Sequence, residues 1–511
     1  MKYIKRSLIL MGFGLWSSCN DAIDILPQSN GNTTTYYSNL EELNAGLAGC
    51  YNGLQRPLYF EWQLTEMRSD NTKMGTPGSQ SAPNRDLSDL DMFIPATIHQ
   101  AVYTYWLNTY NNIRNANIIL DRLGVTYDPS VGSLNLGSIK LPITETERKQ
   151  VAGEALFIRA YHYFNLVRLY GGVFLVHKPI TAMEAKATNR SSVDDIYKLI
   201  EADLKSAATF LSAAKFSAIP AANLGRANAW AAKGLLGKVY LTRNKKAEAI
   251  TQLQDVISNS GYSLLPNYAD VFSVTNEMNA EILFAVRYKA GGFGLGTTFG
   301  NDFAPVSSGT AIINGDGDGN NYPTFEIDSV HVATDKRKAV NMALWTTKYY
   351  VKKFVNQVVL TDDGEGDWPV LRYSDILLMV AEAKGFTPES VTLINQIRTR
   401  VGLAALPATV TTVALFEQAL ADERRFELLF ENQRYFDLLR FNATMTTITA
   451  EKTMKDHFAK EYVKHYSKYP APIPTLAQLQ ANVNANRLLL PIPQREIDTN
   501  TGLKIEQNPG Y

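Results

Sequence analysis

Residues 226–259 carry the pattern that most constrains how this chain can fold. Leu236, Gly237 and Tyr240 recur at helical spacing, and Ala249 places a small residue where a second helix would approach closely. A helix pair of this kind has an apolar face that it cannot bury alone, so neighbouring helices must stack on it. The pattern therefore predicts a mostly helical fold in which pairs of helices pack side by side.

The L-G-x-x-Y spacing and the span of about 34 residues are those of a tetratricopeptide-like repeat. A second helix pair is expected at 370–401, where LRYSDILLMVAEAK precedes ESVTLINQIRTRVGL. The same apolar period predicts further helices at Leu40–Leu54, Ala101–Leu123, Thr146–Tyr170 and Val193–Ser212.

Two stretches, 56–99 and 260–369, interrupt the helical pattern. They are rich in Gly, Asn, Asp, Thr and aromatic residues, as in GGFGLGTTFGNDFAP and NGDGDGNNYP. We expect long loops and a few short strands there, packed on one side of the helix-pair scaffold. Long loops on a rigid scaffold are the usual place for binding residues.

The N-terminus has the features of an export signal, expected over residues 1–18. Lys5 and Arg6 precede a short apolar run, two serines and then Cys19. The run is too short to cross a bilayer of roughly 30 Å as a helix. A cysteine at this point predicts a bacterial lipoprotein that is acylated on the Cys19 thiol, and an ordinary signal peptide followed by an incidental cysteine is the alternative.

The composition of the chain limits the classes of partner that it is expected to bind. The chain has 50 basic and 50 acidic residues, and zero net charge gives no reason to expect a nucleic acid or an anionic membrane surface. No later stretch approaches the roughly eighteen apolar residues of a membrane span. If Cys19 carries lipid, Cys50 has no partner for a disulfide and is expected to pack as a buried apolar residue.

The expected organisation has three parts. The signal at 1–18 is followed by a lipid anchor and polar tether at 19–34. One folded body then covers 35–511. The body includes the loop-rich insert at about 260–369 and a C-terminal block at about 370–511.

Five segments, in order along the chain, carry a resemblance to a known family. They are EALFIRAYHYFNLVRLYGG (154–172), VLRYSDILLMVAEA (370–383), INQIRTRVGL (394–403), ERRFELLFENQRYFDLLRF (423–441) and LLPIPQREIDTNTGLKIEQNPGY (489–511). With the lipoprotein leader, they resemble the SusD/RagB family of Bacteroidota. The resemblance implies a surface lipoprotein of the outer membrane that captures an oligosaccharide, or sometimes a peptide. It implies delivery to a SusC-like TonB-dependent transporter, and a binding protein rather than an enzyme.

Two of these segments are expected to be structural. Charges alternate in sign along 423–441, which favours a solvated or salt-bridged packing helix. The prolines of PIPQREID and NPGY favour an extended tail that packs back on the body.

Sugar capture requires an aromatic face for the C–H surface of the ring and planar polar groups for its hydroxyls. The loops contain three clusters of such residues. Phe299, Asn320 and Asp367 belong to these clusters but are not among the candidate ligand residues. Trp368 is the best single candidate, because the acidic, Gly-rich DDGEGDWP offers it few apolar neighbours, although it could equally anchor the loop to the core. The candidate ligand residues are Asp70, Asn71, Arg85, Phe93, Phe293, Tyr322, Trp368 and Arg372.

No cofactor is expected. Asp316 and Asp318 alternate as in calcium loops, but the twelfth position is Phe325, so the EF-hand pattern is not met and a turn is favoured over bound Ca²⁺. No G-x-S-x-G elbow, P-loop or H-x-x-x-H pair occurs, and GGFGLG belongs to no βαβ unit.

Three rival functions stay open. An oligopeptide could replace the glycan as ligand. A surface glycosidase would need two carboxylates about 5–10 Å apart, which no motif indicates. A repeat scaffold that binds only protein is the third.

Overall fold

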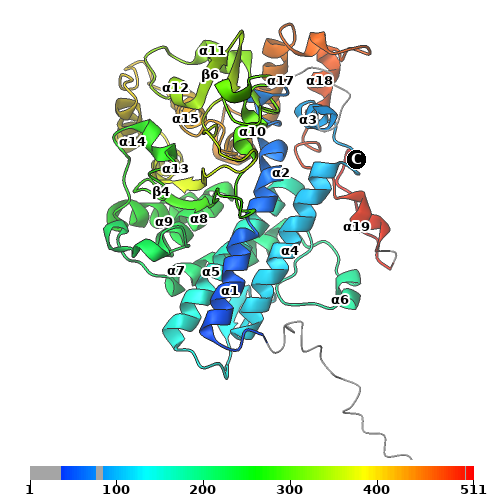
Figure 1. The fold of residues 1–511 in the computed structure, drawn as a ribbon, viewed down its shortest axis with the longest axis vertical. Coiled ribbons are helices and arrows are strands. Elements are labelled where there is room, and N and C mark those ends of the chain that lie inside the picture. The colour runs from blue at the N-terminus through cyan, green and yellow to red at the C-terminus, as the bar shows by residue number, and fades with distance from the viewer. Residues whose placement is uncertain (1–35, 76–83, 501) are drawn as a thin grey trace, which may run out of the picture.

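The computed structural model describes residues 36–75, 84–500 and 502–511, and helices dominate it (Figure 1). The predicted signal at 1–18, Cys19 and the tether at 19–34 lie outside the described residues. The helices are α1 (Leu40–Asn52), α2 (Gln55–Thr65), α3 (Asn84–Asp91), α4 (Gln100–Arg122), α5 (Glu145–Tyr170), α6 (Ala182–Lys186), α7 (Val193–Phe210), α8 (Ala229–Thr242), α9 (Lys246–Asn259), α10 (Phe299–Phe303), α11 (Phe325–Val330), α12 (Lys338–Asn341), α13 (Tyr373–Lys384), α14 (Pro388–Arg400), α15 (Val413–Glu427), α16 (Arg434–Thr444), α17 (Ala450–Glu461), α18 (Leu476–Asn482) and α19 (Gln494–Asp498).

The strands are short and form two-stranded antiparallel pairs. The pairs are β1 (Thr72–Lys73) with β5 (Tyr322–Pro323), β2 (Val125–Asp128) with β3 (Ser133–Leu136), β4 (Ile282–Val286) with β8 (Trp368–Arg372), and β6 (Met342–Trp345) with β7 (Lys348–Val351). The β4–β8 pair lies against α8 and α13, so it joins the loop-rich insert to the helix pairs.

The predicted helix pairs are confirmed. α8 and α9 form the first pair, α13 and α14 form the second, and α9 packs against α13 (Figure 1). Gly237 allows the close approach of α8 to α9, because a Cβ there would lie 2.5 Å from the Leu253 side chain. Ala249 is fully buried in the same interface. The row continues through α7 and α5 to α4, so each pair buries the face of its neighbour.

Local signals set most helix ends. Ser192 accepts a hydrogen bond from the backbone N–H of Asp195 and caps α7, as helix starts require. Gly171 ends α5 with a φ of 73°, a conformation that favours glycine. Cys50 is buried, as predicted, and burial raises the pKa of its thiol to about 12. None of the described helices is long and apolar enough to cross a membrane.

Three expectations were wrong in detail. The stretch 56–99 contains α2 and α3 rather than loop alone, and α2 buries polar side chains such as Glu61 and Gln63 together with its apolar ones. The segment 423–441 is two buried helices rather than one, since Phe430 and Asn432 adopt φ values of 66° and 60° between them. The tail does pack back on the body, where the Asn508 amide donates to the Tyr170 carbonyl, but the QREID part of PIPQREID forms the short helix α19.

A buried network of charges surrounds Glu427 at the end of α15. Its carboxylate accepts hydrogen bonds from Arg372 at 3.1 Å, from Arg337 at 3.2 Å and from Arg400. Burial alone would raise the pKa of Glu427, but the three guanidinium groups hold that pKa well below its usual range. Arg372 also contacts Glu281 and Glu431, so strand, insert and helices share one set of ion pairs.

Replacing Glu427 should lower the stability of the protein, because it breaks this network. In Glu427→Gln, three buried cations lose their shared anion, so the free energy of unfolding should fall by about 3–5 kcal/mol in urea titrations. The matched control is Glu451→Gln, which removes a surface pair with Lys455 and should change stability by less than about 0.5 kcal/mol. Equal losses in the two variants would contradict a special role for the network.

Glu66 follows α2 and is a second buried acid, which forms no ion pair with the residues that the structure describes. One carboxylate oxygen accepts from the Asn432 backbone N–H at 2.7 Å, while the other is buried without a hydrogen bond. Burial raises its pKa from 4.5 to about 8. Between these values the folded chain binds more protons than the unfolded chain, so this group lowers stability as pH rises.

Glu66→Gln should remove that pH dependence. The variant cannot ionise, so its melting temperature should fall less than that of the wild type between about pH 5.5 and pH 8. The group accounts for at most about 1.4 kcal/mol per pH unit in this window. Thermal unfolding at both pH values measures the difference. Parallel pH profiles would mean that Glu66 is ionised in the fold.

Candidate ligand-binding site

A tight hairpin follows β4 and presents an aromatic ring at the surface. Lys289 pairs with Leu295 across it, and three glycines between them adopt positive φ. Gly291 and Gly292 have φ values of 121° and 77°, which the absence of a side chain permits. Phe293 at the tip is 71% exposed, the most exposed aromatic side chain in the described part of the chain.

The hairpin is fixed by the returning segment that leads into β8. The Asp363 carboxylate accepts from the backbone N–H groups of Gly291 and Gly292 at 2.7 and 2.9 Å. These hydrogen bonds lower the pKa of Asp363. Thr297 and Gly364 also exchange two backbone hydrogen bonds. Because this backbone is ordered before any ligand arrives, little entropy remains to be lost when one binds.

A groove of about 410 Å³ lies beside the hairpin, between it and the start of α2. The Gln55 amide donates to the carbonyls of Arg287, at 2.7 Å, and Leu295, at 3.3 Å, and thereby ties α2 to the hairpin. The Asn52 amide donates in turn to Gln55 at 3.0 Å. The groove therefore combines carboxamide groups with aliphatic surface.

Charged groups line one wall of the groove and the surface next to it. Arg287 is half exposed and contacts Asp367 at 2.7 Å and Glu277 at 2.9 Å, and Lys289 pairs with Glu365. Burial raises the pKa of Asp367 to about 6. Burial and the neighbouring Asp367 charge raise the pKa of Glu277 to about 7. A hydroxylated ligand would thus meet a guanidinium, an ammonium and carboxylates beside one exposed ring.

Five of the eight predicted ligand residues are interior. Trp368 is 1% exposed and stacks on Phe354 with ring centroids 4.1 Å apart, so it anchors its loop to the core. Phe93 lies against the Arg68 guanidinium. The others hold ions or amides in buried pairs: Asp70 with Arg434, Asn71 with Arg425, and Arg372 with Glu427. Each of the five is 3% exposed or less in this structure.

The remaining three lie at the surface, in separate segments. Phe293 tips the hairpin, Tyr322 is half-buried in β5, and Arg85 on α3 extends into solvent beside Asp86. Asp316, considered for calcium, accepts backbone hydrogen bonds from Ser307, Gly309 and Gly317, as a turn residue does. Over the described residues, no group of three or more His, Cys, Asp or Glu is placed to hold a metal ion.

Sequence reasoning missed the groove residues Gln55, Arg287 and Lys289. Arg287 follows β4 and Asp367 precedes β8, and nothing in the sequence announces that these two strands pair. Gln55 begins α2 one residue before the stretch 56–99, which was expected to be loop-rich. The secondary candidate Asp367 was the only sign of this wall.

The fold and the loop-borne site define a helical-repeat protein with a surface for ligands, and comparison with known proteins identifies its family. A model of the SusD family matches residues 286–511, and one described as starch-binding, associating with the outer membrane, matches residues 24–241. The chain belongs to the SusD/RagB family. SusD-like protein P25 of Formosa agariphila is 24% identical over 87% of this chain and 91% of its own length.

Solved structures agree on the fold. A laminarin-binding SusD-like protein superposes with a TM-score of 0.74 at 25% identity, covering 93% of this chain and 100% of its own. Surface glycan-binding protein A from Bacteroides thetaiotaomicron, in complex with laminarihexaose, has the same fold with a TM-score of 0.71 at 18% identity, covering 92% of this chain and 99% of its own.

Proposed function

We propose that this chain captures an oligosaccharide at the Phe293 hairpin and the adjoining groove. The observation that carries the proposal is the 71% exposure of Phe293 on a backbone that Asp363 holds in place. An exposed ring costs free energy in water unless it serves a contact, and sugar rings offer a C–H face for it. Gln55 and Arg287 supply planar polar groups within reach of the same groove.

The names of related proteins support this ligand class. The solved relative at 25% identity is a laminarin-binding protein, and one of the two family models is described as starch-binding. Both names describe binding rather than catalysis. The carboxylates nearest the groove, Glu277 and Asp367, already pair with Arg287, which favours a binding role for them too.

We further propose delivery to a SusC-like TonB-dependent transporter in the outer membrane, with Cys19 as the lipid anchor. Three apolar side chains accompany Phe293 at the surface: Leu295, Val359 and Leu360. We call these four the hairpin patch. Leu360 lies against Gly292 of the hairpin, and Val359 is 89% exposed. Exposed apolar groups beside a ligand site suit a contact that closes over the ligand.

Phe293→Ala should abolish or weaken glycan binding without unfolding the protein. Loss of one stacking ring should reduce affinity about tenfold or more, measured by calorimetry against a panel of oligosaccharides that includes laminarihexaose. The control is Phe386→Ala, which removes a less exposed ring that stacks on Phe416, away from the hairpin. If a tryptic digest gave binding heat and no glycan did, the ligand would be a peptide and not an oligosaccharide. Release of product from polysaccharide would replace binding by hydrolysis.

Val359→Asp should weaken the transporter contact and spare the ligand site. A charge in an apolar contact costs several kcal/mol, so co-purification with the co-expressed transporter should drop about tenfold or more. Glycan affinity of the isolated protein should stay unchanged, because Val359 does not line the groove. The matched control is Val463→Asp at a similarly exposed position outside the patch. If Val359→Asp co-purified with the transporter as well as the wild type does, the transporter contact would lie outside the hairpin patch.

A further inference from the structure

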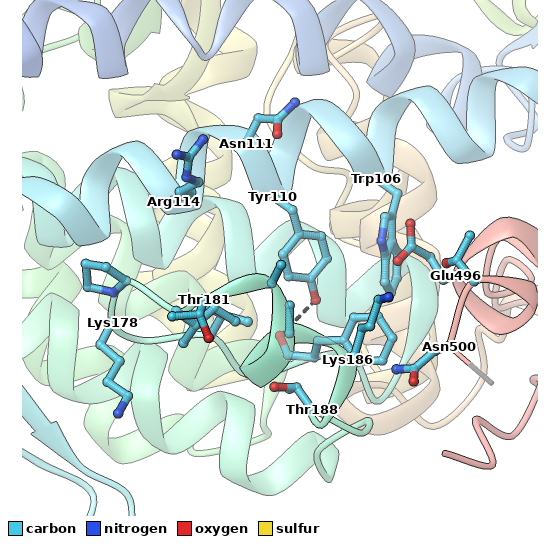
Figure 2. Close-up of a pocket in the computed structure, with 17 residues that line it drawn as sticks. Trp106, Tyr110, Asn111, Arg114, Lys178, Thr181, Lys186, Thr188, Glu496 and Asn500 are labelled. Carbon is cyan, nitrogen blue, oxygen red and sulfur yellow. Dashed lines mark hydrogen bonds between the residues drawn. The ribbon is translucent and has the colours of Figure 1, made fainter. Parts of the chain in front are cut away.

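A second pocket, of about 380 Å³, shares no lining residue with the hairpin groove. It lies between α4, the segment 174–188 that contains α6, and the end of α19 (Figure 2). Its size falls within the range of pockets that hold small ligands. Nothing in the proposed function accounts for it.

The floor of this pocket is aromatic and already fixed. Figure 2 shows Tyr110 reaching from α4 toward the opposite segment, where its hydroxyl donates to the Phe174 carbonyl at 2.8 Å. Trp106 packs on both rings, with centroids 5.0 Å from Tyr110 and 5.6 Å from Phe174. Ile180 and Ala185 extend the apolar surface on the other side. The pocket can therefore cover the apolar face of a ligand without rearranging.

One end of the pocket carries two acceptors that have no partner among the described residues. Asn500 is 8% exposed, and its side-chain oxygen accepts no hydrogen bond from them. The Glu496 carboxylate is half-buried beside it, forms no hydrogen bond or ion pair within the described part of the chain, and burial raises its pKa. Buried polar atoms are nearly always satisfied, so this end is suited to a ligand that brings hydroxyl or N–H donors.

The rim supplies donors. Arg114 and Lys186 are exposed and make no ion pair or hydrogen bond with another residue that the structure describes, and Lys178 lies nearby. A cationic ligand would meet these positive charges, an anionic ligand would meet Glu496, and a purely apolar ligand would leave Asn500 unpaired. A neutral ligand with hydroxyls and an apolar face satisfies every group.

We propose that this pocket is a second carbohydrate-binding site, which takes one end or a short stretch of the glycan. The inference rests on the proposed function, because it assumes that the nutrient is a sugar. Two sites on one chain let a polysaccharide bind at both, and the second contact forms at a high effective concentration. A polymer should then be held more tightly than a short oligosaccharide.

Calorimetry with laminarihexaose and with laminarin tests this on the full folded protein. The wild type should bind two molecules of laminarihexaose. Glu496→Ala with Asn500→Ala should remove one site or weaken it about tenfold or more, since hydrogen bonds to a carboxylate are lost. Ala185→Trp, which fills the pocket and keeps both acceptors, should do the same. Asp498→Asn is the matched control on α19, because Asp498 is exposed, contacts Gln494 and does not line the pocket. Melting temperatures check that each variant folds.

The outcomes separate the two proposals. If one laminarihexaose molecule bound per chain, and Phe293→Ala abolished this binding while both pocket variants left it unchanged, the proposed function would stand and the second site would be overturned. One molecule, lost only in the pocket variants, would place binding here and overturn the hairpin site. If neither laminarihexaose nor laminarin gave heat with any form of the protein, both proposals would be overturned. Laminarin affinity that falls about tenfold or more in either single-site variant would support two cooperating sites.

Discussion

The buried ion pairs around Glu427 are the constraint on which the rest of this structure depends. They collect cations from the insert (Arg337), from β8 (Arg372) and from α14 (Arg400) onto one carboxylate of α15. A buried charge without its partner is several kcal/mol less stable than a paired one, so these segments cannot separate one at a time. The ion pairs thus fix where the loop-rich insert meets the helix pairs, which apolar packing alone would leave less specified.

This junction also determines where the proposed ligand site lies. β8 carries Arg372 at one end and Trp368 at the other, and its partner β4 runs directly into the Phe293 hairpin. Trp368 stacks on Phe354 and packs at a tilt against Phe299, so the end of β8 is anchored in the core. Asp363, a few residues earlier, then holds the glycines of the turn. These hydrogen bonds fix the backbone that carries the exposed Phe293 ring.

The sequence predicted the helices well because their signals are local. The cap Ser192 and the apolar period of α7, and the glycine that ends α5, lie within or next to the helices that they define. The family motifs added the order of the segments. Partners in space are not local. Asp70 and Arg434 are far apart in the chain, so their pairing could not be read from the pattern, and a loop-borne carboxylate looked available for a ligand. Trp368 misled for the same reason, since its aromatic neighbours come from other segments. Phe293 is exposed, as a loop position predicts, because the glycines on both sides of it have no side chains to cover its ring.

The buried ion pairs that hold the fold together and the exposed side chains of the hairpin are different residues. This separation allows one fold to serve different ligands. Removing the exposed Phe293 ring should cost the fold little, because the hairpin backbone is held by Asp363 and not by that side chain. Replacing Glu427 changes no surface but breaks contacts to three segments. Ligand preference can therefore change at exposed positions while the frame stays, which is consistent with a TM-score of 0.74 at only 25% identity. Under the two proposals, ligand specificity resides in the few side chains that the hairpin and the α19 pocket expose.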